Sequence, residues 1–441
     1  MTLQQVFDVP ARRIHFVGVG GIGMSGLAKI MVQDGRAVSG SDLSPNRNTE
    51  ELGALGATIF EGHAAEHAQG AELIVITSAA GQDNPEIRWG LEHGVPVIKR
   101  AAFLGQLMGQ KTGVAISGTH GKTTTTAMVA TILLHAGQDP TIACGGDLLE
   151  LDSNARLGHG PHFVAEADEF DRSFLQLPAA VRVITNIEAD HLDLYGTFDA
   201  LREAFAQFAR EGTVILNADD PETAALARDA GPRAFTFSLR AHEAAAAEQP
   251  ARSPLSLHLS VPGAHNLANA LAALEVARVL DVDQAAAVAA LNEFRGSRRR
   301  LETIGAVNGV EVVDDYAHHP TEIRASLRAL RERAPSKLIC IFQPHLYART
   351  KDLFDEFTTA FGDADQLLII DTYSPAGREE AREVTSEDLA RATGARYVAT
   401  MERAVAAVEP PAGSIVVAMG AGTITRLPAM LIERLRRKAR G

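Results

Sequence analysis

Short apolar runs recur along the chain and alternate with longer segments of helical character. In the first hundred residues these runs predict strands at residues 14–17, 37–40, 57–60, 73–76 and 97–98. Short strands that alternate with helices are typical of parallel α/β sheets. This part of the chain is therefore predicted to form a small Rossmann-like parallel sheet.

The same alternation continues through the rest of the chain. Further strands are predicted at residues 114–116, 163–165, 181–184, 310–313, 338–342, 367–370 and 414–417. A chain of 441 residues exceeds a single hydrophobic core, and roughly 150 residues per domain predicts three domains. We place these α/β domains at residues 1–108, 109–294 and 295–441, with a flexible loop or irregular hairpin between Arg240 and Pro262.

A first glycine-rich loop follows the first predicted strand. Gly18, Gly20 and Gly23 form a G-x-G-x-x-G pattern, and a helix is expected over residues 26–34. Asp42 ends the second strand about 20 residues later, where dinucleotide folds place the carboxylate that binds the ribose. An ordinary NAD site, as in a dehydrogenase, is one interpretation of this segment alone; a nucleotide diphosphate site is the other. In either case the candidate binding residues are Gly20, Gly21, Ile22, Gly23 and Asp42.

A second glycine-rich loop is the most informative stretch of the sequence. Residues 117–124 read Ser-Gly-Thr-His-Gly-Lys-Thr-Thr, between an apolar strand and an apolar helix. Backbone amides at such a helix start bind phosphate, Lys122 would reach the β- and γ-phosphates, and the Thr123 hydroxyl would bind Mg²⁺. The pattern predicts an ATP site formed by Gly118, Thr119, His120, Gly121, Lys122, Thr123 and Thr124.

Acidic clusters follow the next two strands of this segment. Glu166 follows the strand at 163–165, and His191 ends the sequence Asn-Ile-Glu-Ala-Asp-His after the strand at 181–184. Parallel strands deliver their carboxyl ends to one edge of a sheet, so both side chains can converge on Thr123. Mg²⁺ prefers oxygen ligands, and histidine is a less usual one. We predict a magnesium site that includes Thr123, Glu166 and His191.

Two asparagines lie at the start of a later predicted helix. Asn266 and Asn269 are three residues apart, after a Pro-Gly turn, and so share one helix face. A carboxamide combines a donor with an acceptor, which suits the edge of adenine. The alternative is that both side chains satisfy nearby backbone groups.

Composition narrows the classes of protein that remain. The formal net charge of −13 argues against a nucleic-acid binder with a broad basic surface. Cys144 and Cys340 lie far apart in the sequence and predict free thiols in a reducing cytoplasm. We find no secretory signal pattern and no apolar run approaching the roughly 20 residues of a membrane helix. We therefore expect a cytoplasmic enzyme without a membrane partner.

Seven motifs, in order from about residue 12 to about residue 425, together resemble the Mur ligase family. They are Gly-Val-Gly-Gly-Ile-Gly-Met-Ser at 18–25, the loop at 117–124, Glu-Ala-Asp-Glu at 166–169, Thr-Asn-Ile-Glu-Ala-Asp-His at 185–191, His-Asn-x-x-Asn at 265–269, Asp-Asp-Tyr-Ala-His-His-Pro at 314–320 and Phe-Gln-Pro-His at 342–345. The resemblance implies an N-terminal Rossmann-like domain for a UDP-sugar and a central P-loop ATPase-type domain for ATP. It also implies a C-terminal Rossmann-like domain that closes over ATP and binds an amino acid.

Within this family the chain is most similar to members that join L-alanine to the lactyl carboxylate of UDP-N-acetylmuramic acid. The resemblance implies that ATP phosphorylates this carboxylate and that the amine of L-alanine then attacks the acyl phosphate. A tetrahedral intermediate would collapse to amide and phosphate. Charge neutralisation by Lys122 and Mg²⁺ suits such a phosphoryl transfer. We expect a monomer or homodimer, with hinges near residues 109 and 295.

The resemblance assigns roles to residues of the central domain. It implies that Thr123 and Glu166 hold a first magnesium ion and that His191 holds a second. It also implies that Asn266 and Asn269 contact adenine. Mg²⁺, in two ions, and ATP are therefore the expected cofactors.

Residues of the third domain complete the site that the resemblance implies. Arg300 would reach the γ-phosphate and Asp315 the ribose, while Tyr316, His318 and Arg349 would lie near L-alanine and the acyl phosphate. His318 is a candidate proton acceptor because histidine ordinarily titrates near neutral pH. The predicted catalytic residues are Lys122, Glu166, His191, His318 and Arg349.

Two positions depart from the family pattern. Leu346 replaces an arginine found in some relatives, and Arg202 stands where several Mur ligases keep a lysine that can be carbamylated. Arginine cannot form that carbamate, so we predict no carbamyl-lysine in this chain. Two alternatives to the alanine-adding reaction stay open: a recycling ligase that adds a preformed peptide to the same sugar nucleotide, and a nucleotide-binding module without catalysis.

Overall fold

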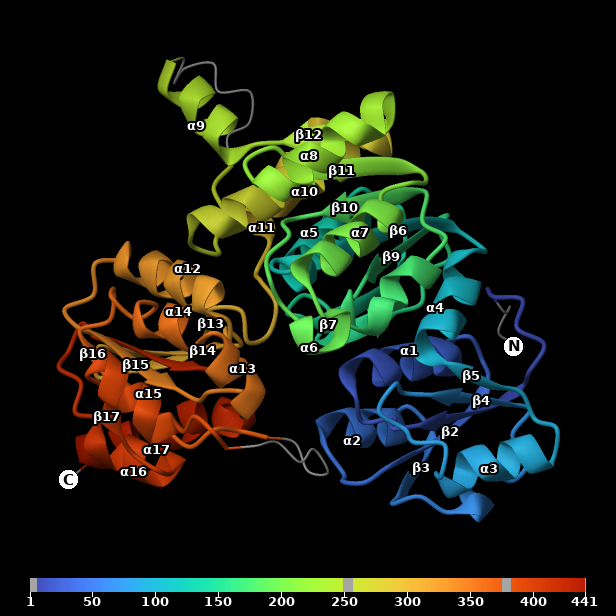
Figure 1. Ribbon diagram of the computed structural model, residues 1–441, viewed down its shortest axis with the longest axis horizontal. Helices are drawn as coiled ribbons and strands as arrows, with labels where there is room; N and C mark the ends of the chain where they lie inside the picture. Colours follow the sequence, from blue (N-terminus) through green and yellow to red (C-terminus); the bar gives the residue numbers. More distant parts are fainter. Residues whose placement is uncertain (1–5, 249–256, 375–381, 441) are drawn as a thin grey trace. The chain divides into compact units, whose positions relative to one another are not determined.

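The chain forms two compact units in the computed structural model, which describes residues 6–248, 257–374 and 382–440. One unit comprises Met1–Leu259 and Ala268–Arg295, and the other comprises Ser260–Leu267 and Gly296–Gly441. The first unit contains two sheets and the second contains one (Figure 1). Each sheet is mainly parallel and its strands alternate with helices, which confirms the predicted α/β fold class.

The first sheet is parallel throughout, with the strand order β3-β2-β1-β4-β5. Its strands are β1 (Arg13–Val17), β2 (Ala37–Asp42), β3 (Thr58–Glu61), β4 (Leu73–Ile76) and β5 (Val97–Lys99). Its helices are α1 (Ile22–Gln33), α2 (Arg47–Ala54), η1 (Ala65–Ala68), α3 (Pro85–Glu92) and α4 (Arg100–Met108). The chain leaves β1 toward β2 and later returns to β4 on the other side. The first glycine loop therefore lies at the switch point where such sheets bind ligands.

The second sheet has the order β12-β11-β10-β6-β9-β7-β8, and its pairs are parallel except for the β7–β8 hairpin. Its strands are β6 (Thr112–Ser117), β7 (Thr141–Leu148), β8 (Ser153–Arg156), β9 (His162–Glu166), β10 (Val181–Ile184), β11 (Thr213–Asn217) and β12 (Ala234–Phe237). The helices of this region are α5 (Lys122–His135), η2 (Phe170–Gln176), α6 (Leu192–Tyr195), α7 (Phe198–Phe208), α8 (Pro221–Ala230), η3 (Gly231–Arg233), α9 (Leu239–Glu248), α10 (Ala264–Val279) and α11 (Gln284–Glu293). Because β6 lies between β9 and β10, the ends of all three strands meet at one edge.

The third sheet has the order β13-β14-β18-β15-β16-β17, with only the β13–β14 pair antiparallel among its described strands. Its strands are β13 (Glu302–Val307), β14 (Val310–Asp315), β15 (Leu338–Phe342), β16 (Gln366–Ile369), β17 (Arg396–Tyr397) and β18 (Ile415–Met419). Its helices are α12 (Pro320–Arg331), α13 (Tyr347–Asp352), α14 (Phe354–Thr358), α15 (Ser386–Thr393), α16 (Met401–Ala407), η5 (Thr423–Arg426) and α17 (Leu427–Arg440). The polar sequences after β14 and β15 again lie at one edge of the sheet.

Apolar side chains spaced three or four residues apart attach the helices to these sheets. In α1, Leu27 and Ile30 are buried against the first sheet, together with Phe103 of α4. In the third sheet, α12 covers one face with Leu327 while α17 covers the other with Leu431. This spacing is the helical period of an amphipathic face, so burial of one stripe fixes each helix on its sheet.

Two local predictions were wrong. Helix α1 begins at Ile22 rather than at residue 26, because Gly21 adopts an extended conformation and starts the helix inside the glycine loop. The region after Arg240 is partly helical: α9 runs from Leu239 to Glu248, while residues 249–256 lie outside the described part of the chain. Alanine has the highest helix propensity, and the run of alanines in α9 explains the difference.

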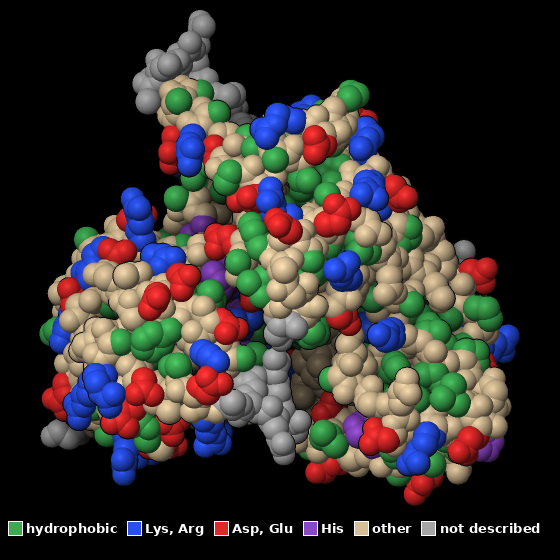
Figure 2. Space-filling view, in the orientation of Figure 1, with side chains coloured by type: hydrophobic (Ala, Val, Ile, Leu, Met, Phe, Trp, Pro, Cys, Tyr) green, Lys and Arg blue, Asp and Glu red, His purple; other side chains and the backbone are tan. Residues whose placement is uncertain are grey.

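On the face drawn in Figure 2, Lys and Arg side chains are interspersed with Asp and Glu side chains. Within the described ranges, no helix has the combination of length and apolar character that crossing a membrane requires.

Candidate active site

The phosphate-type loop at residues 117–124 connects β6 to α5 at the centre of the second sheet. Gly118 and Gly121 adopt positive φ angles of 125° and 83°. A Cβ atom on Gly118 would lie 2.1 Å from Oγ1 of Thr185 and 2.9 Å from its backbone nitrogen. Only glycine combines this backbone conformation with such a close approach, so the loop is shaped by both glycines.

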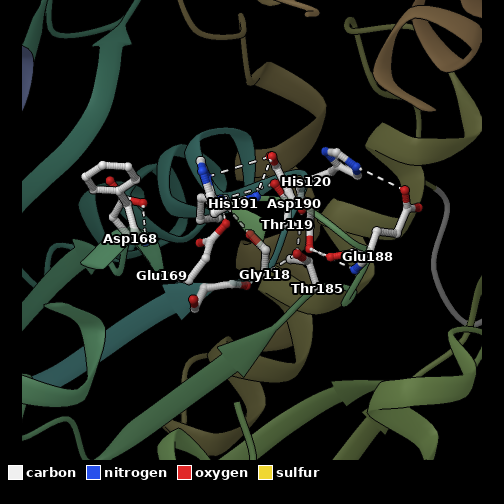
Figure 3. A network of polar contacts seen from close by, with 12 residues as sticks. Gly118, Thr119, His120, Asp168, Glu169, Thr185, Glu188, Asp190 and His191 are labelled. Atoms are coloured by element: carbon white, nitrogen blue, oxygen red, sulfur yellow. Dashed lines mark hydrogen bonds and ion pairs between the residues drawn. The ribbon is translucent and has the colours of Figure 1, made fainter. Parts of the chain in front are cut away.

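The segment that follows β10, a neighbour of β6 in the sheet, holds this loop in place (Figure 3). Asn186, just after β10, accepts the backbone N–H of Thr119 at 3.0 Å through its carbonyl and that of His120 at 2.9 Å through its side-chain oxygen. Thr185 and Asn186 both donate to the carbonyl of His120. The backbone N–H of Glu188 donates to Oγ1 of Thr119 at 2.9 Å. Residues 185, 186 and 188 therefore contact the loop directly, whereas the approach of His191 to Thr123 stays a prediction.

Lys122 lies at the first turn of α5 and folds back over the loop. Its Nζ donates to the carbonyls of Gly118 and Thr119 at 2.6 and 3.1 Å, and to Oε1 of Glu169 at 2.9 Å. Burial opposes the charge on Lys122, but the carboxylate of Glu169 outweighs it and raises the pKa of the lysine. Lys122 is therefore a cation, and an arriving phosphate group competes with Glu169 for it.

Glu169 is a site residue to which the sequence analysis gave no role. It is 2% exposed, and burial raises the pKa of its carboxyl to about 7, although Lys122 opposes this shift. Tyr195 donates to its carbonyl at 2.6 Å. Asp171 and Arg172, at positive φ of 53° and 62°, form an abrupt turn just after it. The motif at 166–169 contained the residue, but nothing in the sequence indicated its contact with Lys122.

Glu166 and Thr123 lie beside two adjacent glycines of β7. The backbone N–H of Gly145 donates to Oε2 of Glu166 at 2.8 Å. A Cβ atom on Gly145 would lie 2.4 Å from both carboxylate oxygens, and one on Gly146 would lie 3.0 Å from Cγ2 of Thr123. Each of the two predicted ligands therefore lies against a glycine of β7, where a larger residue would clash with it. Hydroxyl and carboxylate oxygens at such a site fit Mg²⁺.

His191 adopts a left-handed conformation with φ of 55° at the start of α6. Its Nε2 lies 3.7 Å from Oδ2 of Asp190, and its ring meets that of Phe170 edge to face at 5.4 Å. Phe170 follows Glu169 directly, so the histidine lies close to the segment that carries the lysine partner (Figure 3). A non-glycine residue in this conformation is strained and is typical of functional sites.

The two predicted adenine contacts differ in their surroundings, although both lie on α10. Asn269 faces the loop: a Cβ atom on Gly121 would lie 2.5 Å from its Oδ1. Asn266 donates to the carbonyl of Pro262 at 2.7 Å. Asn266 therefore makes the local backbone bond that was the alternative interpretation, whereas Asn269 lies at the phosphate-type loop.

Backbone groups of the first glycine loop are held mainly by the end of β2. The carbonyl of Ser41 accepts the N–H groups of Gly18 and Val19 at 2.8 and 3.0 Å. Oδ2 of Asp42 accepts the N–H of Gly20 at 2.8 Å, and Asn48 donates to the carbonyl of Gly20 at 2.8 Å. Asp42 and Gly20 thus come together as predicted.

Arg100 is a second residue that the sequence analysis missed. It begins α4, and its guanidinium lies 3.0 Å from the position that a Cβ atom on Gly23 would occupy. This places a cation beside a loop whose own residues, 18–25, carry none. A basic residue directly after the short strand β5 was the only signal available.

The β7–β8 hairpin contacts elements of both glycine loops within this unit. Asn154 of β8 donates to the carbonyl of Ile22, the first residue of α1, at 2.7 Å. Its Oδ1 accepts a hydrogen bond at 3.1 Å from Lys29, which is 2% exposed and also pairs with Glu51 at 2.7 Å. The same hairpin carries the glycines that surround Glu166, so it ties α1 to the predicted magnesium site.

In the second unit, the residues predicted to lie near L-alanine follow β14 and β15 and form one cluster with Arg300. Arg300 precedes β13 and was predicted to reach the γ-phosphate. The guanidinium of Arg300 lies 5.1 Å from the ring centre of Tyr316, and the rings of Tyr316 and His318 are 5.3 Å apart. The ring of His318 lies 5.8 Å from that of His345, whose Nδ1 is 3.3 Å from Nη1 of Arg349. The structure therefore brings Arg300, Tyr316, His318 and Arg349 together.

Burial shifts the pKa values of His318 and of the neighbouring Asp315. Burial, together with Arg349 and His345, lowers the pKa of His318 to about 3 despite the nearby Glu322, so its ordinary pKa is no guide to a role as proton acceptor. Asp315 is 3% exposed, and its carboxylate accepts the backbone N–H groups of Leu301 and Ala317 at 3.1 and 2.6 Å. Burial raises the pKa of Asp315 to about 6, and the carboxylate is used within its own sheet.

Of the two positions that depart from the family pattern, one is a buried leucine and the other is an arginine in ion pairs. Leu346 is 8% exposed, with a positive φ of 68°, at the start of α13. Arg202 on α7 pairs with Glu222 at 2.7 Å and with Asp199 at 3.2 Å. The lysines of the central segment, Lys111 and Lys122, both donate hydrogen bonds through Nζ.

The fold and these sites are those of an α/β protein with two glycine-rich loops of the nucleotide-binding type, one of which carries Lys122 paired with Glu169. Profiles described as "Mur ligase family, catalytic domain", "Mur ligase middle domain" and "Mur ligase, glutamate ligase domain" match residues 13–112, 116–277 and 299–422. The chain belongs to the Mur ligase family.

Individual relatives are similar over nearly their whole length. A UDP-N-acetylmuramate–L-alanine ligase of Acidobacterium capsulatum is 42% identical, over 96% of this chain and 98% of its own. The crystal structure of the UDP-N-acetylmuramate-alanine ligase MurC from Thermotoga maritima has a TM-score of 0.81 at 30% identity, over 97% and 99% of the two chains. A murein peptide ligase from Psychrobacter arcticus has a TM-score of 0.70 at 25% identity, over 96% and 98%.

Proposed function

We propose that this chain is an ATP-dependent ligase that joins L-alanine to the lactyl carboxylate of UDP-N-acetylmuramic acid, in the synthesis of peptidoglycan precursors in the cytoplasm. The observation that carries the proposal is similarity to alanine-adding ligases along almost the whole chain, at 42% identity for the relative from Acidobacterium capsulatum. The loop that contains Lys122, together with the predicted ligands Thr123 and Glu166, supports the proposal, because phosphoryl transfer needs a cation and ligands for a metal ion.

The first chemical step is transfer of the γ-phosphoryl group of ATP to an oxygen of the lactyl carboxylate, with ADP leaving. Lys122 is positioned to neutralise the phosphates once it leaves Glu169. Loop amides at the start of α5 bind the same oxygens, since no side chain within the described ranges caps this helix. Mg²⁺ at Thr123 and Glu166, with a second ion at His191, would neutralise charge on the transferred group. Such transfer depends mostly on positioning and charge.

The second step forms the amide. The amine of L-alanine attacks the carbonyl carbon of the acyl phosphate to give a tetrahedral intermediate. This intermediate collapses with loss of phosphate, and the proton of the amine passes to solvent. A neutral His318 with a pKa near 3 is a weak base for an ammonium group, so we assign it to orienting the amine rather than to storing its proton. The roles of Arg300, Asp315, Tyr316 and Arg349 stay predictions.

The sugar nucleotide is assigned to the first glycine loop. Its α1 helix start offers amides for the diphosphate, and Arg100 adds a cation beside Gly23. Asp42, which already accepts the N–H of Gly20, is placed to bind a ribose hydroxyl as well. Adenine is assigned to the region of Asn269, beside Gly121.

Mass spectrometry of the product tests this function. The purified protein is incubated with ATP, Mg²⁺, UDP-N-acetylmuramic acid and L-alanine, and each component is omitted in turn. The proposal requires a sugar nucleotide extended by one alanine, formed only in the complete mixture. A second series replaces L-alanine with a preformed peptide, because the fold is also similar to a murein peptide ligase. Extension by the peptide but not by alanine would transfer the assignment to that activity.

A further inference from the structure

A buried carboxylate in the first domain is surrounded by three histidines. Glu86 lies in the first turn of α3 and is 0% exposed. Its Oε2 lies 3.1 Å from Nδ1 of His63, and its Oε1 lies 3.1 Å from Nδ1 of His67 and 3.7 Å from Nε2 of His15. These groups come from β1, the segment after β3, η1 and α3. The function proposed above gives none of these four residues a role.

Glu86 is held in its ionised form. Burial alone would raise its pKa, but hydrogen bonds and charge from the surrounding groups, His15 and Ser41 foremost, lower it to about 2. A buried carboxylate is costly unless its oxygens are bonded, and each oxygen here has close polar neighbours. Its histidine partners are fixed in turn: His15 contacts Ser39 at 2.8 Å, and the ring of His67 stacks on Phe60 at 4.3 Å.

Ser41 connects this cluster to the first glycine loop. Its Oγ donates to Oε2 of Glu86 at 2.7 Å and lies 3.0 Å from Nδ1 of His63. The carbonyl of the same residue accepts the N–H groups of Gly18 and Val19, at 2.8 and 3.0 Å. The next residue, Asp42, accepts the N–H of Gly20. One side-chain hydrogen bond thus anchors the dipeptide that fixes three successive loop amides.

We propose that Glu86 is a positioning residue for the sugar nucleotide, acting through Ser41 on Asp42 and the loop at residues 18–23. Glu86 itself is buried and does not touch the ligand. Loss of its charge removes the strong acceptor that holds Ser41, so the loop amides and Asp42 lose a fixed orientation toward the nucleotide. The inference rests on the proposed function, because it takes the occupant of this loop to be UDP-N-acetylmuramic acid.

The proposal predicts an effect on one substrate only. In Glu86→Gln the shape is retained but the charged acceptor is lost, so we expect the Kd for UDP-N-acetylmuramic acid in calorimetry, and its KM, to rise about tenfold. The KM for ATP, the KM for L-alanine and kcat at saturating sugar nucleotide should stay within about twofold. Glu92→Gln is the matched control, because Glu92 is an exposed glutamate on the same helix and should bind as wild type.

A double-mutant cycle separates this role from general support of the fold. Ser41→Ala removes the connecting hydroxyl and leaves Glu86 with its histidines, so it should weaken sugar-nucleotide binding to a similar degree. If Glu86 acts through Ser41, the double variant binds no more weakly than the worse single variant. Thermal unfolding of each variant confirms that folded protein is compared, and Ser41→Ala supplies the test if Glu86→Gln does not fold.

The outcomes separate this inference from the proposed function. Wild-type protein that does not bind UDP-N-acetylmuramic acid overturns both. Wild-type binding with an unchanged Kd in folded Glu86→Gln or in Ser41→Ala overturns the positioning role alone. Equal losses for ATP, or additive effects in the double variant, would also overturn it, because they indicate a general effect on the domain.

Discussion

The two glycine-rich loops occupy equivalent places, because each connects the carboxyl end of a central strand to a helix. They are surrounded by different polar groups. The first loop is held by the carbonyl of Ser41 and the carboxylate of Asp42, which bind backbone N–H groups. The second loop carries its own cation, Lys122, which is paired with the buried Glu169. Neither helix start has a side-chain cap among the described residues, so both retain donors for anions.

This difference indicates a division of work. A lysine paired with a carboxylate can exchange that partner for phosphate oxygens and follow the charge that moves during phosphoryl transfer. A loop fixed by a carboxylate and a carbonyl has no such group and is suited to holding a nucleotide that does not react. Changes in the second loop should therefore lower kcat, whereas changes in the first should raise the KM for the sugar nucleotide.

The largest effect is expected for Lys122→Ala. Loss of the only cation in the second loop removes its charge from the transferred phosphoryl group, and we expect kcat to fall by about 10³-fold or more. Phosphate release at saturating substrates measures it. Lys438→Ala, which removes an exposed lysine paired with Glu409 on the last helix, is the control and should keep full activity. A Lys122→Ala enzyme within tenfold of wild type would contradict the assigned role.

Alanine substitutions at one glycine of each loop compare the loops directly. Gly118→Ala forces a side chain into a positive φ and against the backbone nitrogen of Thr185, so we expect kcat to fall by about 10²-fold as the loop is displaced. Gly20→Ala meets only the side-chain ends of Asn46 and Asp42, which can move. It should mainly raise the KM for the sugar nucleotide. Steady-state kinetics with each substrate varied measures both effects. A lowered kcat in Gly20→Ala with a raised KM for the sugar nucleotide in Gly118→Ala would contradict the comparison.

The ionisation of Glu86 should make the free energy of unfolding of the first domain fall at acidic pH. The pKa of Glu86 is lowered from 4.5 to about 2, so its ionisation stabilises the fold above the unfolded pKa, and this stabilisation is lost as pH falls from about 5 to 2. The shift corresponds to about 3 kcal/mol. Denaturant unfolding should show a free energy that falls more steeply in wild type than in Glu86→Gln over this range. Parallel curves would contradict the assigned ionisation.

The smallest effect is expected from removal of carbon dioxide. Arg202 is engaged with Glu222 and Asp199, and arginine cannot become a carbamate. Activity should therefore be the same in bicarbonate-free and bicarbonate-containing buffer, measured by phosphate release. Dependence on bicarbonate, or electron density for a carbamate on Lys111 or Lys122, would show that a lysine takes this role.

The sequence was sufficient to predict most of the strands and the meeting of their ends, but β7, β8, β11, β12, β13 and β17 were not predicted. Glu166 and the segment after β10 reach the loop at residues 117–124 because parallel strands place their carboxyl ends at one edge, and this follows from alternation alone. The start of α1 was predicted too late because the extended conformation of Gly21 cannot be read from glycine spacing.

Contacts that depend on turns between distant segments could not be predicted. Glu169 reaches Lys122 next to a turn with positive φ at Asp171 and Arg172, neither of which is a glycine. Glu86 meets Ser41 and His63 only after three strands have been assembled into a sheet. Glu169 and Glu86 are residue types common throughout the chain. Their polar partners are set by the packing of the folded chain and not by their neighbours in the sequence.

The central claim is that the second loop carries out the chemistry while the first holds the sugar nucleotide. The most direct test is phosphate release by wild type, Lys122→Ala and Asp42→Asn, with UDP-N-acetylmuramic acid varied at saturating ATP, Mg²⁺ and L-alanine. The account predicts that Asp42→Asn reaches nearly the wild-type rate at high sugar nucleotide, while Lys122→Ala stays inactive at every concentration. Recovery of Lys122→Ala at high sugar nucleotide, or a lowered kcat with unchanged KM in Asp42→Asn, would contradict it.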